Sequence, residues 1–295
     1  MKNAFFIFFA FSFNVSNGQN FKAYITKADS MYQAKSYVKS GELYVEALKL
    51  IDEKYVEPVE LFNTAKSFAQ QKDALKACSY LQKVITRGGV TATRIRTEAD
   101  FNPIQSSKEW TKVLKRAKEM DEGIDSTLIN ILQVMGTDDQ LYRKKIDSLY
   151  LNSVKNNELK SGYFKQQSLL DSLNLIKAKE ILDSRGFPSR RLVGRHNAVL
   201  FYIIQHADLN YQESYYNAFE AAANRGDLSW RTLCLMTDRI RMRKGLKQLY
   251  GTQISTKDGV SVLYEVEDYD HLDERRLKIG LEPIKQYASF FGVRL

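Results

Sequence analysis

Hydrophobic and small residues in the first third of the chain follow a pattern that recurs 37 positions later. Successive members of each set are 4, 3, 9, 4 and 3 residues apart, which suits two helices joined by a turn. The first set is Tyr24, Ala28, Met31, Ser40, Tyr44 and Ala47, and the second is Leu61, Ala65, Phe68, Ala77, Leu81 and Val84. Small members allow close approach of the helices, and large ones fill the space between them. The pattern predicts two consecutive helix–turn–helix units.

This pattern resembles the tetratricopeptide repeat, whose usual period is about 34 residues. The resemblance implies an α–α superhelix over residues 19–120, with a concave groove that holds a protein or a peptide. Gly41 and the segment 70–73 fall near the expected turns, and Gly88–Gly89 would end the second unit. An atypical third unit is expected over residues 91–119. A generic pair of helical hairpins is the alternative.

The rest of the chain, residues 121–295, predicts an α-rich second domain. Residues 121–137 resemble a linker because glycine and acidic residues surround a short apolar stretch. Helices are expected over residues 164–182, 196–207, 211–224 and 229–244, and the first should bury Leu169, Leu173 and Ile176 on one face. The helical period is lost near residues 253–265, where two short strands around Asp258–Gly259 predict a hairpin. The expected fold class is mostly all-α.

The first 18 residues have the features of a signal peptide. Lys2 precedes an apolar run from Ala4 to Phe13, and small or polar residues follow at Ser16–Gly18. The run is about half the length needed to cross a bilayer, so cleavage is favoured over a permanent anchor. We therefore expect an exported bacterial protein, periplasmic or secreted, without stable membrane insertion after cleavage.

Charge and composition indicate which classes of binding partner are expected. The 295 residues carry 44 Lys+Arg and 35 Asp+Glu, and the segment 19–120 accounts for 18 and 12 of these. A weakly basic groove favours acidic peptides or anionic surfaces, whereas no basic run indicates a nucleic-acid partner. Cys78 and Cys234 lie on apolar helical faces and are expected as buried thiols, with an interdomain disulfide as the alternative. No metal-ligand spacing occurs, and no cofactor is expected.

Several short polar motifs stand out in the second domain. They are Gln205–His206–Ala207–Asp208, Asp238–Arg239, Tyr250–Gly251–Thr252–Gln253, and Arg185–Gly186–Phe187–Pro188 leading to Val193–Gly194, with Asp139–Gln140 and Arg143 upstream. Together they resemble an uncharacterised bacterial domain family over residues 128–287. That family has no established activity, so the resemblance implies an architecture and candidate positions but no reaction.

The same motifs allow a functional and a structural interpretation. In the functional one, His206 lies on the apolar face of its helix and acts as a general base that Asp208 or Asp238 orients. The candidate ligand-binding residues are Arg143, Gln205, Arg239, Tyr250, Thr252 and Gln253. In the structural one, His206 donates to a backbone carbonyl, Asp238–Arg239 pairs with the hairpin, and Gly251 permits a tight turn.

Two functions follow from these interpretations. The preferred one is an exported interaction scaffold whose second domain is an accessory ligand-binding module. The alternative is a metal-independent hydrolase or transferase that acts on a polar anionic substrate, with His206 as the base. The other two histidines, His196 and His271, are expected at the surface.

Overall fold

The computed structural model describes residues 16–152, 156–257, 260–293 and 295. Within these ranges the chain is mainly helical, and its one sheet is an antiparallel pair, β1 (Ile254–Lys257) and β2 (Val260–Leu263). The predicted fold class, mostly all-α with one small hairpin, is confirmed. Most of the predicted signal peptide, residues 1–15, lies outside the described residues. Among the described helices, none has both the length and the apolar character needed to cross a bilayer.

Two helical hairpins occupy the places of the repeated pattern. They consist of α1 (Ser16–Gln33), α2 (Tyr37–Leu48), α3 (Pro58–Gln70) and α4 (Ala74–Thr86). The turns match as well, since Lys35 and Lys72, 37 positions apart, both have positive φ, 58° and 62°. Ala28 and Ala65 are completely buried, as the close approach of helices requires. The hairpins are therefore structural equivalents, and their assignment as tetratricopeptide repeats stays a prediction.

Gly41 has a different role from the predicted one. It lies inside α2, and a Cβ atom there would come within 2.7 Å of Gln71 Nε2. Glycine therefore leaves room for the Gln71 side chain where α2 packs on the end of α3, while the turn itself is formed at Lys35.

A shorter set of helices continues this half of the molecule. It contains η1 (Glu53–Tyr55), α5 (Ala92–Thr97), η2 (Ala99–Ile104) and α6 (Lys108–Asp121). Ser107 caps α6 by accepting a hydrogen bond from the Trp110 backbone N–H, at 3.1 Å. Trp110, Val113 and Ala117 then bury the inner face of α6 against α4.

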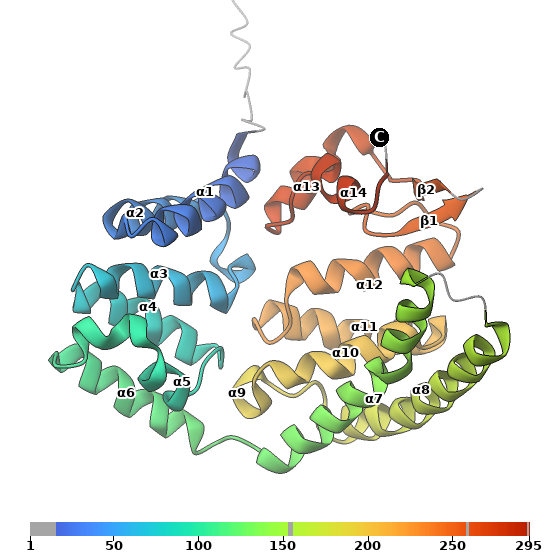
Figure 1. Cartoon of the computed structure of the whole chain (residues 1–295), viewed down its shortest axis with the longest axis horizontal. Coiled ribbons are helices and arrows are strands. Elements are labelled where there is room, and N and C mark those ends of the chain that lie inside the picture. The colour runs from blue at the N-terminus through green and yellow to red at the C-terminus, as the bar shows by residue number, and fades with distance from the viewer. Residues whose placement is uncertain (1–15, 153–155, 258–259, 294) are drawn as a thin grey trace, which may run out of the picture.

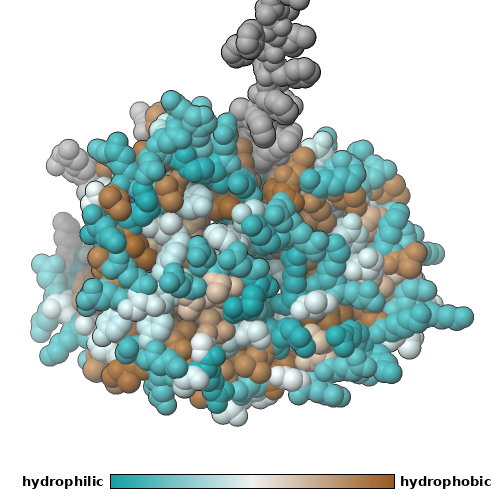
Figure 2. Space-filling view, turned by 180° about the vertical axis from the view of Figure 1, so that it is seen from behind, coloured by the Kyte–Doolittle hydropathy of each residue, from teal (hydrophilic) through white to brown (hydrophobic). Residues whose placement is uncertain are grey.

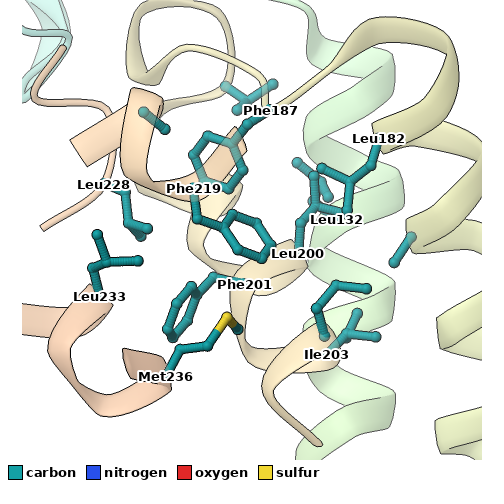
Figure 3. Close-up of a cluster of buried hydrophobic side chains, with 14 of the residues drawn as sticks. Leu132, Leu182, Phe187, Leu200, Phe201, Ile203, Phe219, Leu228, Leu233 and Met236 are labelled. Atoms are coloured by element: carbon teal, nitrogen blue, oxygen red, sulfur yellow. The ribbon is translucent and has the colours of Figure 1, made fainter. Parts of the chain in front are cut away.

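The second half surrounds a core of aromatic and aliphatic residues. Its elements are α7 (Ser126–Leu151), α8 (Asn157–Arg185), α9 (Arg190–Val193), η3 (Gly194–Asn197), α10 (Ala198–His206), α11 (Leu209–Asn224), α12 (Trp230–Arg243), η4 (Tyr269–His271), α13 (Leu272–Lys278) and α14 (Ile284–Phe290). Phe187, Phe201 and Phe219 meet edge to face at its centre (Figure 3). Leu132 of α7 and Met236 of α12 complete this core from opposite sides.

Two expectations for α7 and α8 are wrong. Residues 126–137 are not a linker, because α7 runs through them. Gly136 lies where this helix approaches α10, and a Cβ atom added there would be 3.0 Å from Val199 Cγ2. Leu169, Leu173 and Ile176 do not form a buried face and are 55%, 47% and 64% exposed. The buried stripe of α8 is polar at Gln167 and Asn174, because these amides bind the backbone of α7.

The two halves pack against each other, so that helices from opposite ends of the chain are neighbours. Figure 1 shows α1 beside α13, and the two helices are in contact. One apolar cluster joins Phe21 and Leu61 of the first half to Cys234, Ile279 and Leu281 of the second. Part of the surface of the hairpins is therefore covered by the chain itself. The face of the molecule that lies behind the view of Figure 1 is mainly hydrophilic, with hydrophobic residues in separate patches (Figure 2).

Both cysteines are buried free thiols, as expected from their apolar neighbours. Cys78 packs in the core of the first half, whereas Cys234 belongs to the cluster between the halves. Burial raises the pKa of the Cys78 thiol to about 11 and also raises that of Cys234. Both groups are protonated near neutral pH and act as small apolar residues.

Candidate functional site

Asp238 is an anchor for a turn, and its carboxylate is completely buried. Oδ1 accepts hydrogen bonds from the backbone N–H of Leu249 at 2.7 Å and of Tyr250 at 3.0 Å. Oδ2 accepts from both the N–H and the hydroxyl of Thr252, each at 2.9 Å. A carboxylate with this many donors is stable in the interior without a cation. The geometry thus gives Asp238 and Thr252 a structural role.

The motif Tyr250–Gln253 is the turn that Asp238 holds. Gly251 has φ of 65° and lies against Ile284, so a side chain there would be strained as well as crowded. Gln248 closes the turn on the other side, because its amide donates to the carbonyl of Gln253 at 3.1 Å and accepts from that residue's N–H at 2.9 Å. Burial raises the pKa of Tyr250 to about 12, so its phenol stays neutral. No sequence motif singled out Gln248.

Arg239 connects this turn to the end of α10. Its Nε donates to Gln253 Oε1 at 3.3 Å, and its Nη1 donates to the carbonyl of Gln205 at 3.0 Å. Arg243 donates to the carbonyl of Ala207 at 2.8 Å, and Gln212 donates to that of Gln205 at 2.7 Å. These side chains satisfy the last carbonyls of α10, which have no partner within the helix.

His206 is exposed at the end of α10, which corrects the expectation that it lies on the apolar face. Its ring makes no hydrogen bond to any described residue. Asp208 precedes α11 as its N-cap residue, exposed and without a side-chain cap bond. The structure therefore does not place Asp208 or Asp238 in hydrogen-bonding contact with His206.

The acidic groups near His206 come instead from α7 and α8, which both pack against α10. Arg143 lies between Asp139 and Asp171, with Nη2 3.3 Å and 2.7 Å from their respective Oδ1 atoms. Gln167 donates to the same oxygen of Asp171 at 2.7 Å. Although the His206 side chain is exposed, neighbouring protein atoms desolvate its ring in part, and this desolvation and the Arg143 guanidinium lower the pKa of His206, whereas Asp139 opposes the effect. These charges therefore lie close enough to affect the imidazole.

Gln167 and Asp171 were missed by the sequence analysis. The available signal was the spacing of Gln167, Asp171, Asn174 and Ala178, which is as helical as that of the leucines on the opposite face. Hydrophobicity alone favoured Leu169, Leu173 and Ile176 as the buried face of this helix.

Three buried polar atoms around this end of α10 have no partner among the described residues. They are Gln205 Oε1, Gln212 Oε1 and Arg143 Nε. Gln205 is 8% exposed and Gln212 is completely buried, so these oxygens are shielded from bulk solvent. Buried polar atoms are normally paired with protein, ordered water or a ligand. The arrangement thus combines an exposed imidazole with unsatisfied acceptors and a partly unsatisfied guanidinium.

The comparison with protein families bears on this half of the molecule. Residues 126–293, more than half of the chain, match a family of unknown function, DUF6624. The chain belongs to the DUF6624 family. The match starts at the first residue of α7 and includes all the polar motifs, so the predicted family domain is confirmed over this range. No curated protein and no solved structure matches the chain.

The two exposed histidines should affect stability in opposite directions as the pH changes. The folded pKa of His206 lies below 6.5, so below pH 6.5 the unfolded chain binds the proton first and wild type loses stability. Asp268 raises the pKa of His271, so that pair stabilises the fold at low pH and loses its effect as the pH rises through the folded pKa.

Urea unfolding between about pH 5 and pH 8 measures both effects. His206→Gln should become more stable relative to wild type as the pH falls, and His271→Gln less stable. The same sign for both variants would contradict the assigned surroundings of His206.

Proposed function

We propose that the DUF6624 domain binds a small polar ligand at the end of α10, next to His206. The unpartnered amide oxygens of Gln205 and Gln212 carry this proposal, because they need hydrogen-bond donors that the described residues do not provide. The ligand therefore carries N–H or O–H groups. Arg143 already pairs with Asp139 and Asp171, so a negative group on the ligand would depend on Arg239 and on the unpartnered Nε of Arg143.

A catalytic role of the same site is the second candidate, a metal-independent hydrolase or transferase. The lowered pKa of His206 supports it, because a neutral imidazole at physiological pH can accept a proton. Its exposure supports access of a substrate. In this version the charges of Asp139 and Asp171 favour the protonated imidazole, whereas the sequence suggested Asp208 or Asp238 as the orienting residue.

The first half of the molecule fits the role of an interaction scaffold in an exported protein. A groove of about 680 Å³ beside α2 and α4 is lined by apolar side chains such as Val38, Phe68, Leu75 and Tyr80, together with two glutamates, Glu42 and Glu46, and two lysines, Lys76 and Lys83. Its apolar lining and mixed charges suit an amphipathic peptide with hydrophobic side chains. The apolar signal-like segment at the N-terminus supports export to the periplasm or beyond.

Thermal-shift screening of polar metabolites tests the proposed ligand site. A ligand present at about one hundred times its Kd should stabilise the full chain by about 2.7 kcal/mol. Gln205→Leu keeps the volume but removes the acceptor, and it should abolish the shift, as should His206→Ala. The matched control is His271→Ala, an exposed histidine remote from α10, which should retain the full shift.

Two outcomes would count against this proposal. One is the absence of any stabilising compound in a panel of amino acids, sugar acids and nucleotides. The other is an equal shift in wild type and in Gln205→Leu. Turnover of a stabilising compound, detected by mass spectrometry and lost in His206→Gln, would favour the enzyme over the binding module.

A further inference from the structure

A second cleft lies where the two halves of the molecule meet. It has a volume of about 790 Å³ and extends from the loop after α4 to α9 and η3. The end of α6 and the start of α7 close its remaining side. Volumes in this range are typical of sites for small molecules, which often form between domains.

The residues that line this cleft are mainly of two kinds, apolar and basic. Apolar side chains come from both halves, among them Val90 of the first and Ile129 and Val193 of the second. Basic side chains also come from both halves: Arg94, Arg190, Arg191, Arg195 and His196. The two acidic residues are Glu57 and Asp121. A molecule in the cleft would therefore meet an apolar surface and several guanidinium groups together.

The acidic residues of the cleft do not neutralise its arginines. Glu57 accepts a hydrogen bond from the Ser229 hydroxyl, and Asp121 accepts one from the Ala92 backbone N–H at 2.8 Å. Arg94 has its own partner, Glu98, at 2.7 Å. Both carboxylates of the cleft are thus used for contacts within the fold.

Three guanidinium groups remain without a counter-ion. Among the described residues, no carboxylate oxygen lies within 4.0 Å of a guanidinium nitrogen of Arg190, Arg191 or Arg195. Asp227 accepts only the backbone N–H of Arg190, at 2.8 Å, and pairs with the guanidinium of Arg225. The Nε atom of Arg190 is buried and has no hydrogen-bond partner within the described ranges, and Arg191 reaches only the sulfur of Met120, at 3.2 Å. A shielded donor of this kind is costly unless an acceptor pairs with it.

The backbone keeps these arginines close to the first half. Gly88 has φ of 64°, and a Cβ atom there would overlap the backbone of Arg190 and Arg191. Asp125 N–H donates to the carbonyl of Leu192 at 2.9 Å, which fixes α9 to the start of α7. The close approach at Gly88 and the hydrogen bond at Leu192 therefore bring the cationic segment to the cleft.

We propose that this cleft binds an organic anion, a carboxylate or a phosphate with an apolar body. The anionic group pairs with Arg190, Arg191 and Arg195, since guanidinium groups bind both oxyanions in bidentate geometry. The apolar body packs against Val90, Ile129 and Val193. Because both halves supply contacts, the bound molecule stabilises their packing. This site is separate from the one at His206.

Calorimetric titration of the full chain tests the cleft, with octanoate and octyl phosphate as probes and octanol as the neutral analogue. We expect at least one anion to bind, and octanol to bind at least about tenfold more weakly. The variant Arg190→Gln/Arg191→Gln/Arg195→Gln should lose at least about tenfold in affinity, which corresponds to about 1.4 kcal/mol. Arg195→Gln alone, at an exposed residue, should show part of the loss without affecting the fold.

The matched control removes the same charge elsewhere, by Lys108→Gln/Lys112→Gln/Lys115→Gln on the exposed side of α6. Its affinity for the anions should lie within about twofold of that of wild type if the arginines act locally. Equal losses in the two triple variants, equal affinities for octanol and the anions, or no binding of either anion at millimolar concentration would each overturn the proposal. A preference for octyl phosphate over octanoate, or the reverse, identifies the anionic group.

Discussion

Asp238→Ala should lower the free energy of unfolding by about 4 kcal/mol, the largest single effect that we expect in the DUF6624 domain. The change removes one buried carboxylate and leaves three backbone N–H groups and the Thr252 hydroxyl without their acceptor. Each buried donor that loses its partner costs about 1–3 kcal/mol, and some of this cost is recovered if water enters. The turn at Tyr250–Gln253 should become mobile. Chemical denaturation and thermal melting measure the effect, with a fall in Tm on the order of 10 °C.

Asp208→Ala is the control for this experiment. Asp208 is also an aspartate of a family motif, but its side chain is exposed and makes no cap bond. Its replacement should change stability by less than about 0.5 kcal/mol. If Asp238→Ala were as stable as Asp208→Ala, the structural role of Asp238 would be wrong.

Glu60→Gln should weaken the packing of the two halves, at a cost of about 3 kcal/mol. Glu60 and Arg231 form an ion pair at 2.9 Å, and their side chains are only 6% and 17% exposed. Glutamine keeps the shape but leaves the charge of Arg231 uncompensated, close to Lys22. Burial and the charge of Arg231 lower the pKa of Lys22, so the protonated form of a lysine is already disfavoured at this place.

A double-mutant cycle separates the pair from its surroundings. Glu60→Gln combined with Arg231→Met should recover much of the lost stability, because no unpaired charge remains. Glu53→Gln is the matched control, since Glu53 is 60% exposed where it pairs with Arg87 at 3.2 Å. It should cost at most about 1 kcal/mol. A loss in the double mutant that equals the sum of the single losses would contradict the proposed coupling.

The helical hairpins of the first half were predictable because the pattern of large and small residues that forms them is local and repeated. Two sets with the same spacing fixed the helices, and even the positive φ of Lys35 recurs at Lys72. Helix boundaries in the second half were less predictable where packing between helices, and not local composition, determines the structure. Gly136 suggests a linker in the sequence, yet it lies in the middle of α7, where a Cβ atom would come within 3.0 Å of Val199 and the two helices pack closely.

The candidate site was predictable in its positions but not in its partners. The motifs identified His206, Arg239 and Gln205, since they combine unusual polar residues with helix ends. They did not reveal that Asp171, from a helix with a misassigned face, would lie near His206 while Asp238 would bind the turn. Such pairings depend on how α7, α8 and α10 pack, and one sequence does not encode this in any local pattern.

The contact between α1 and α13 has a consequence for the order in which the molecule forms. Phe21 is completely buried, and its cluster includes Ile279 and Leu281, about 260 positions later in the chain. During synthesis, α1 therefore emerges long before the residues that cover it. The hairpins of the first half can form at once from neighbouring residues, whereas their apolar side must remain uncovered until the last turns of the chain arrive. The cluster between the two halves therefore cannot close before residues 279–281 have been synthesised.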